Sequence, residues 1–230
     1  MRSATWNDRE LVTAILSDTF RDNPGVNSMF RKEVDPAVCL QRLARYALLK
    51  AANRKGAWIA SNEKGLIFFF EADKHPFSFR EWIHEVFFAF SCIGWRRLPQ
   101  VMRREATRRS FRPADNKYLY CWFLAVLNEG RGAAYELKNF LFSESRRRNL
   151  PIYLETSTVR NKIVYERIGF TAFHEWLDEK EGVRFWSMKW DPNEGERHLK
   201  KEIEKEEQNE EQKEKEGIQI KESTDEASAL

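Results

Sequence analysis

Apolar residues recur at helical and strand spacings along most of the chain, and this pattern predicts its elements. In the first half, intervals of three and four residues predict helices over residues 7–20 and 35–52. Two short apolar runs, at 57–60 and 66–70, predict strands joined by a hairpin turn. A long helical pattern with two interruptions then covers residues 79–109.

The second half of the chain alternates strands with helices. The predicted elements are a strand at 118–126, a helix ending at Arg148, a strand at 152–155, a helix at 160–168, and strands at 170–176 and 184–190. This alternation predicts an α/β fold in which helices flank a twisted, mixed central sheet.

Composition divides the chain of 230 residues into a body and a tail. The content of 42% hydrophobic and 13% aromatic residues is enough for one substantial core. Residues 193–230 carry 7 Lys+Arg against 13 Asp+Glu and few apolar residues, so we expect a domain at 1–192 and an acidic tail that is disordered or forms a lone charged helix. The domain keeps 32 basic against 23 acidic residues, which suits an anionic ligand.

Cysteine spacing and the lack of long apolar segments indicate the cellular compartment in which the protein is expected. Cys39, Cys92 and Cys121 form no CxxC pair, so we expect neither a disulfide framework nor a metal site. The first residues lack the apolar segment of a signal peptide, and no apolar run approaches the ~20 residues that span a bilayer. We therefore expect a cytoplasmic protein.

A glycine-bearing loop joins the strand at 118–126 to the helix that follows it. The loop reads Glu129-Gly130-Arg131-Gly132-Ala133-Ala134. The first backbone N–H groups of a helix lack internal partners, and glycine allows an anion to approach them closely. The loop therefore suits a phosphate group, although an ordinary strand-to-helix turn would also explain the glycines.

A second motif lies about thirty residues further on, at 153–170. It places Asn161, Tyr165, Glu166, Gly169 and Phe170 in the order N-x-x-x-Y-E-x-x-G-F. This stretch resembles the GNAT superfamily of acetyl-CoA-dependent N-acyltransferases, and the likeness covers residues 118–190. The glycine loop stands where that family has Q/R-x-x-G-x-G/A, with Glu129 in place of the usual Gln or Arg.

The resemblance implies a GNAT fold and transfer of an acyl group from acetyl-CoA, or another acyl-CoA, to a primary amine within a ternary complex. It implies that backbone groups of Leu124, Ala125 and Val126 pair with the pantetheine arm and that Asn161 contacts the pantetheine amides. The pyrophosphate would lie on the segment Glu129, Gly130, Arg131, Gly132, Ala133 and Ala134.

The resemblance also assigns catalytic roles. Tyr165 matches the tyrosine that protonates the departing thiolate, and a phenol is protonated at neutral pH as this role requires. An aromatic ring packed beneath the sheet is the alternative. Glu155 resembles a glutamate that some members use as general base, and His174 is a second candidate. Glu155 could equally cap a helix, and His174 could face solvent.

Two segments between 79 and 112 form a helical insertion that the family motifs do not explain. Residues 79–95 carry an apolar stripe, for which core packing is favoured over a roof for the acceptor pocket or a dimer face. The stripe consists of Phe79, Trp82, Ile83, Val86, Phe87 and Phe90.

Residues 96–112 hold seven arginines, for which a solvated face is favoured over a site for the CoA 3′-phosphate, RNA, an acidic protein or a membrane. We expect an amine acceptor and allow a homodimer, but expect no nucleic-acid or membrane partner. A degenerate GNAT domain that binds only acyl-CoA or another macromolecule is the alternative function.

Overall fold

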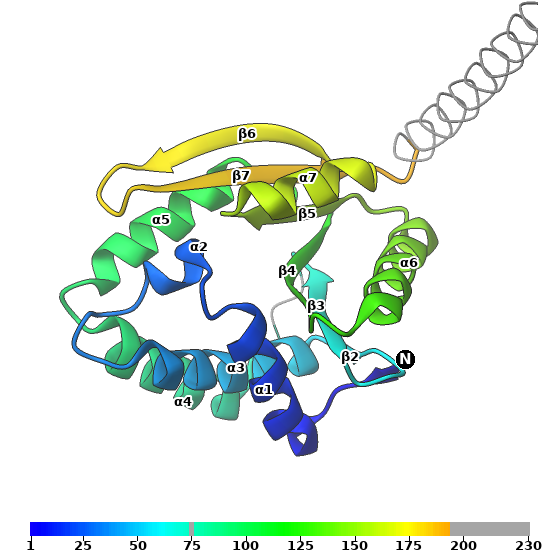
Figure 1. Ribbon diagram of the computed structural model, residues 1–230. Coiled ribbons are helices and arrows are strands. Elements are labelled where there is room, and N and C mark those ends of the chain that lie inside the picture. Colours follow the sequence, from blue (N-terminus) through cyan, green and yellow to red (C-terminus); the bar gives the residue numbers. More distant parts are fainter. Residues whose placement is uncertain (74–75, 194–230) are drawn as a thin grey trace, which may run out of the picture. The chain divides into compact units, whose positions relative to one another are not determined.

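The computed structural model describes residues 1–73 and 76–193, except for the side chain of Arg131. Residues Met1–Pro192 form one compact unit, shown in Figure 1. The predicted acidic tail lies outside the described residues from position 194 onward. No helix in the described ranges is long and apolar enough to cross a membrane.

Seven strands form one mixed sheet in the order β1-β2-β3-β4-β5-β7-β6. Only the β4–β5 pair is parallel among these described strands, and the other neighbours are antiparallel. The strands are β1 (Arg2–Ser3), β2 (Ala57–Ile59), β3 (Gly65–Glu71), β4 (Leu119–Val126), β5 (Ile152–Thr156), β6 (Thr171–Asp178) and β7 (Val183–Trp190). The predicted mixed α/β architecture is confirmed.

Helices cover both faces of the sheet. They are α1 (Arg9–Thr19), α2 (Pro24–Asn27), α3 (Pro36–Asn53), α4 (Phe79–Phe88), α5 (Leu98–Ser110), α6 (Arg131–Arg148) and α7 (Val159–Arg167), with a 3₁₀ turn at Trp6–Asp8 and a π-helical turn at Ala89–Ile93. Figure 1 shows α1 and α3 on one side of the central strands and α6 on the other.

Strand β3 explains why the sheet is buried on both faces. Its alternate residues enter two different cores, with Leu66 and Phe68 beside α1 and α3, and Ile67 and Phe69 beside α6. A strand covered on both sides reads as a continuous apolar run rather than an alternating one. The run Leu-Ile-Phe-Phe-Phe in this strand therefore follows from its central position.

The structure differs from the predicted elements at two places. The short helix α2 was not predicted, and the Asn23 side chain caps its start by accepting a hydrogen bond from Val26 N at 3.0 Å. The two-residue strand β1 was not predicted either, since it is too short to show a period. An interruption of the long helical segment was predicted near Gly94 and is confirmed, because the chain continues from α4 into a π-helical turn and breaks at this glycine, whose φ is +78°.

Candidate functional site

Strands β4 and β5 separate soon after they begin to pair. Their register contains two pairs, Leu119 with Ile152 and Tyr120 with Tyr153. Beyond these pairs β4 continues to Val126 along β3 alone, with a bulge at Trp122. The edge of β4 that faces β5 therefore offers backbone groups to an extended ligand, as in β-strand addition.

The start of α6 lies just past the end of β4 and forms a candidate anion site. Its N-cap is Gly130, which makes no side-chain capping bond, so the first amides of the helix depend on an external acceptor. A Cβ at Gly132 would meet no atom within 4 Å, whereas a Cβ at Gly130 would lie 2.8 Å from Val126 Cγ1. Gly130 is therefore required by packing, and the space at Gly132 is open.

Two amides of the segment predicted to bind phosphate already have partners within the chain. The amide of Gly130 already donates to Leu127 O at 2.7 Å, and that of Ala134 donates to Gly130 O at 3.3 Å. These two amides serve the turn and the first helical bond, so the expectation that they would bind phosphate is corrected. The amides of Arg131, Gly132 and Ala133 are the others of the first helical turn, in which Gly132 is exposed and Ala133 is buried.

Glu129 does not point its charge into the start of α6. Its carboxylate pairs with Lys64 Nζ at 2.9 Å, and its side chain is 82% exposed. The hydrogen bond from Lys64 lowers the pKa of Glu129. The carboxylate is thus neutralised by a neighbouring lysine, and it is not a ligand of the phosphate position.

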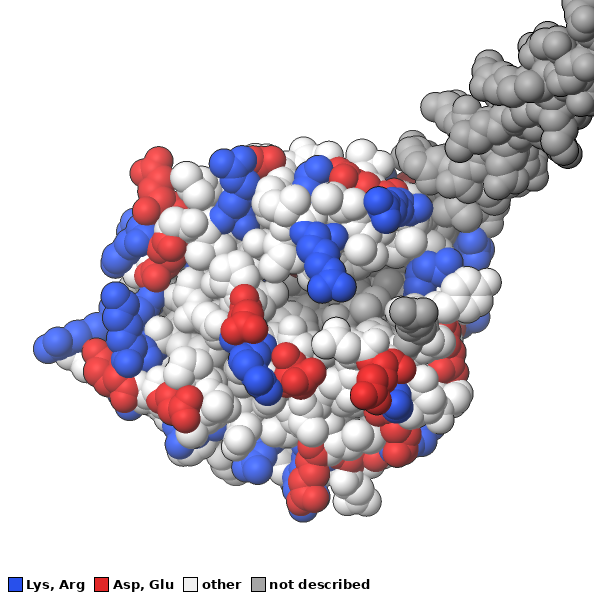
Figure 2. Space-filling model, viewed as in Figure 1, with Lys and Arg blue, Asp and Glu red and all other residues white. Residues whose placement is uncertain are grey.

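A pocket opens where β4 and β5 diverge, and Figure 2 shows the surface hollowed below α7. It brings together residues from both ends of the chain. Apolar walls come from the α1–α2 segment, β4 and β7, and α7 adds polar groups. The lining includes Phe20, Val26, Met29, Trp122, Phe123, Leu124, Asn161, Tyr165 and Phe185.

Tyr165 both packs and lines the pocket. Its ring lies 5.5 Å from the ring of Phe170 on the α6 side of the sheet. Burial, with a smaller contribution from the Cys121 thiol, raises the pKa of the Tyr165 phenol. The hydroxyl is therefore protonated at neutral pH, which suits a proton donor and excludes a resting phenolate. Asn161, one turn earlier on α7, is exposed at the same pocket.

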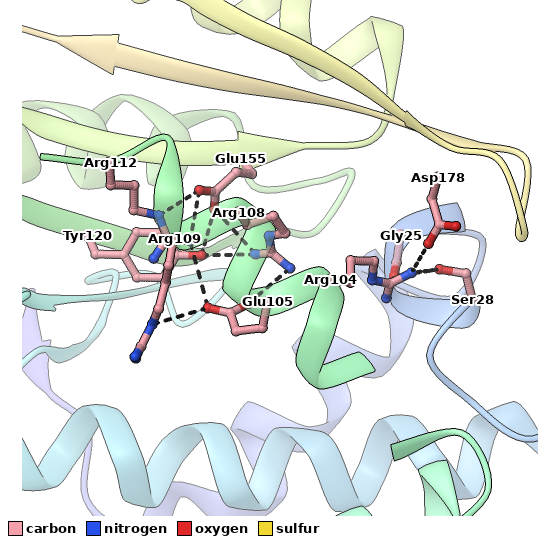
Figure 3. Close-up of polar contacts among 10 residues, drawn as sticks. All are labelled: Gly25, Ser28, Arg104, Glu105, Arg108, Arg109, Arg112, Tyr120, Glu155 and Asp178. Carbon is pink, nitrogen blue, oxygen red and sulfur yellow. Dashed lines mark hydrogen bonds and ion pairs between the residues drawn. The ribbon is translucent and has the colours of Figure 1, made fainter. Parts of the chain in front are cut away.

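Glu155 also lines the pocket, but within a dense polar cluster drawn in Figure 3. Its carboxylate accepts hydrogen bonds from Arg112 Nε at 2.8 Å, Tyr120 Oη at 2.7 Å and Arg108 at 3.3 Å. Burial alone would raise the pKa of Glu155, but the two guanidinium groups outweigh it and hold that pKa below its usual value. A carboxylate held in this way is a weak base.

The arginines of α5 turn inward, contrary to the expectation of a solvated face. Arg104 is buried and bonds Ser28 Oγ at 2.8 Å, Gly25 O at 3.3 Å and Asp178 at 3.4 Å. With Arg108 and Arg112 it forms a row at spacings of four residues, directed toward α2, β5 and the β6–β7 hairpin. The remaining arginines of the segment that are exposed are Arg96, Arg103 and Arg109.

The sequence did not lead us to predict that the row of three arginines points into the fold, or that Tyr120 on β4 bonds with Arg108 and Glu155. The four-residue spacing of three arginines is a signal that could have found it, because such spacing places side chains on one helix face. His174, the second candidate base, packs its ring 3.7 Å from that of Phe111 and is not among the pocket-lining residues.

Solved structures provide an independent test of the architecture. A structure of histone acetyltransferase HPA2 and related acetyltransferase from Corynebacterium glutamicum matches with a TM-score of 0.57 at 17% identity, covering 83% of this chain and 94% of that one. Arylalkylamine N-acetyltransferase 2 from Aedes aegypti matches with a TM-score of 0.54 at 14% identity, covering 83% and 97%. The chain has the GNAT fold.

A third solved structure, the Drosophila melanogaster polyamine N-acetyltransferase, matches the GNAT fold of this chain with a TM-score of 0.50 at 12% identity, covering 83% and 98%. No protein-family model matches the sequence. The likeness to these structures shows the fold of the chain and not its reaction.

Replacing Glu155 by Gln tests whether this carboxylate holds the cluster or acts as a base. We expect the Glu155→Gln protein to lose about 3–5 kcal/mol of unfolding free energy at pH 7, because two buried guanidinium groups lose their counter-charge. Since the folded pKa of Glu155 is lowered, its stabilisation is complete above the unfolded value near 4.5 and is lost as pH falls through the folded value. Denaturant titrations at pH 7 and pH 4 measure the difference.

The matched control for this substitution is Glu105→Gln. Glu105 contacts the same arginines from a side chain that is 44% exposed, so its replacement should change stability by less than about 1 kcal/mol. Unchanged stability of Glu155→Gln together with a thousandfold lower kcat would show that Glu155 is the base.

Proposed function

We propose that this protein is an N-acyltransferase that moves an acetyl or other acyl group from coenzyme A to a primary amine. The observation that carries the proposal is the separation of β4 from β5 beside a pocket lined by Tyr165. The start of α6, whose first amides have no side-chain cap, follows shortly after the same strand. An extended thioester with an anionic end fits this arrangement of an open strand edge and a helix N-terminus.

The acyl-CoA would be held almost entirely by main-chain groups. The pantetheine arm would pair with Leu124, Ala125 and Val126, whose other edge is bonded to β3. The pyrophosphate would accept hydrogen bonds from the amides at 131–133, where the helix dipole adds partial positive charge. Asn161 is exposed at the pocket and would bind a pantetheine amide.

The chemistry follows from the groups around the pocket. The neutral amine nitrogen attacks the thioester carbonyl, the C–S bond breaks, and the amine loses one proton to solvent. Tyr165 donates its phenolic proton to the departing thiolate and is reprotonated from solvent. The phenol is fully protonated before each turnover, but its raised pKa makes it a weaker acid, so the thiolate would have to form directly beside it to take the proton.

Glu155 would position the pocket rather than accept the proton of the amine. Its carboxylate already accepts hydrogen bonds from Arg108, Arg112 and Tyr120, and its pKa is lowered. In this role it fixes the C-terminal end of α5 against β5. The amine would reach the site in its neutral form from solution.

The acceptor would be an amine with an apolar body. The pocket walls offer the rings of Phe20, Trp122, Phe123 and Phe185, while Arg108 adds a cation. Aromatic rings favour an aryl or alkyl group on the acceptor, and the carboxylate of Glu155 that lines the pocket is already paired with Arg108 and Arg112. Among the structural neighbours, one is named for arylalkylamines and one for polyamines, so both acceptor types are worth comparing.

Thiol release from acetyl-CoA in a panel of amines tests the reaction and its specificity. We expect turnover with arylalkylamines and at least about tenfold lower kcat/KM with polyamines, because the walls are largely aromatic and the Glu155 carboxylate is already paired with two arginines. Calorimetry with acetyl-CoA accompanies the assay. Binding of acetyl-CoA without thiol release from any amine would favour the alternative, a degenerate domain that only binds acyl-CoA.

Substitution of Tyr165 by Phe isolates the proton donor. We expect kcat to fall about 10²-fold while the Kd for acetyl-CoA stays within about twofold, since only a hydroxyl is removed. Tyr135→Phe, which alters an exposed tyrosine on α6, is the matched control and should leave kcat unchanged. Full activity of the Tyr165→Phe protein would remove the assigned role.

Replacing Gly132 by Ala separates ligand binding from folding. The added Cβ enters open space, so the unfolding free energy should stay constant or rise by up to about 1 kcal/mol. The same Cβ occupies the approach of an anion to the α6 amides, so we expect the Kd for acetyl-CoA to rise about tenfold. Calorimetry and denaturant titration measure both quantities.

Gly130→Ala provides the contrast for this substitution. Its Cβ would lie 2.8 Å from Val126 Cγ1 and 2.9 Å from Lys64 O, so stability and binding should fall together. If Gly132→Ala kept the wild-type affinity for acetyl-CoA, the phosphate would lie elsewhere.

A further inference from the structure

Helix α4 and the π-helical turn after it present an apolar face to solvent. Five large side chains at helical spacing are between 45% and 64% exposed. We call this set the α4 apolar face, and it consists of Phe79, Trp82, Ile83, Phe87 and Phe90. The expectation that the stripe packs into the core is therefore wrong, and the stripe does not line the pocket beside Tyr165 either.

Helix α4 is held against α3 by its two carboxylates and by Phe88. Glu81 is buried and pairs with Arg54 at 2.9 Å, and Glu85 accepts a hydrogen bond from Tyr46 Oη at 2.7 Å. Phe88 is the buried aromatic residue of the helix and stacks on Tyr46. The carboxylates of α4 thus bond to α3 while most of its aromatic residues point outward, which is the reverse of an ordinary surface helix.

Cations are interleaved with the exposed rings. The guanidinium of Arg42 on α3 lies 4.9 Å from the ring of Phe87, and Arg45 on α3 and Arg80 on α4 are exposed. Burial, and then the charges of Arg80 and Arg45, lower the pKa of His84 on α4, so both arginines lie near that side chain. Helix α3 contains no Asp or Glu. The surface made by α3 and α4 therefore combines aromatic side chains with positive charge, and the two carboxylates of α4 are bonded to Arg54 and Tyr46.

Beyond Gly94 the same combination continues. Trp95 is 70% exposed beside the exposed Arg96, and Met102 is 63% exposed beside the exposed Arg103. Amphipathic helices that lie in a membrane interface carry Trp, Phe and Leu on one side and Lys or Arg at its edges.

We propose that the α4 apolar face, with Arg42, Arg45 and Arg80 beside it, docks on the surface of an anionic lipid bilayer. Charge complementarity favours this occupant over a second copy of the chain. A two-fold dimer through this face would bring up a second copy of the same surface, in which α3 offers no carboxylate to the arginines. A bilayer instead offers phosphate and carboxylate headgroups to the cations and an acyl layer to the rings. The exposed stripe is the reason to replace the earlier expectation of no membrane partner.

Vesicle flotation with the full chain tests the proposal. One set of vesicles is phosphatidylcholine alone, and the other contains about 30% phosphatidylserine. We expect flotation with the anionic vesicles, and a loss of bound protein when NaCl is raised from about 0.1 M to about 0.5 M, because the cationic contribution is screened.

Two variants separate the apolar and charged contributions. The double substitution of Trp82→Ala and Phe87→Ala should lower binding to anionic vesicles about tenfold, and Arg45→Gln with Arg80→Gln should lower it several-fold. Leu177→Ala, which removes a side chain that is 49% exposed on β6, is the matched control and should bind as the parent does. Circular dichroism and acetyl-CoA binding confirm that each variant folds.

Three outcomes would overturn the proposal. The first is no flotation with either vesicle type. The second is equal flotation of the parent and the double aromatic variant. The third is a homodimer, measured by sedimentation, that dissociates in the double aromatic variant, because the face would then belong to a second copy.

Discussion

The early separation of β4 from β5 is the constraint on which the rest of the site depends. Two parallel pairs, Leu119 with Ile152 and Tyr120 with Tyr153, join the strands before they part. Each buried backbone N–H or C=O needs a partner, so an open strand edge inside a fold calls for a ligand or water. The pocket, Tyr165 and the start of α6 all lie along this opening or at its end.

The inward row of arginines on α5 holds the opposite wall of the opening. Arg104 joins α5 to the α2 segment and to Asp178 at the end of β6, while Arg108 and Arg112 join it to Glu155 on β5. Figure 3 shows these contacts along one side of the helix. Four elements that are distant in sequence are thus linked by buried charge, and removing one partner of such a set leaves an uncompensated ion. The inserted helix therefore belongs to the pocket.

Much of the architecture could be predicted from the sequence because its signals are local. The alternation after residue 118 predicts the mixed sheet, and Asn161 with Tyr165 falls on one helix at the pocket, as the motif implies. The separation of β4 from β5 could not be read in this way, because strand register depends on pairing between distant segments. The apolar period of α4 predicts a stripe but not its direction, to which the bonds of Glu81 and Glu85 contribute.

The two faces of the insertion show the same limit of periodicity. Arg104, Arg108 and Arg112 point inward because carboxylate and carbonyl oxygens on other elements accept their hydrogen bonds. On α4 most of the aromatic rings point outward, because the Glu81 carboxylate on the opposite side of the helix is paired with Arg54. In both helices polar bonds to other elements help to decide which side faces the fold. The four-residue spacing of the arginines shows that they share a face, but the partners of that face lie on distant elements, which a local pattern does not identify.

A crystal structure of the protein with coenzyme A tests the central claim most directly. The account predicts pantetheine in extended form along Leu124–Val126, pyrophosphate oxygens within hydrogen-bond distance of the amides at 131–133, and the sulfur beside Tyr165 Oη. Coenzyme A bound away from the opening between β4 and β5, or a Tyr165 hydroxyl turned away from the sulfur, would contradict it.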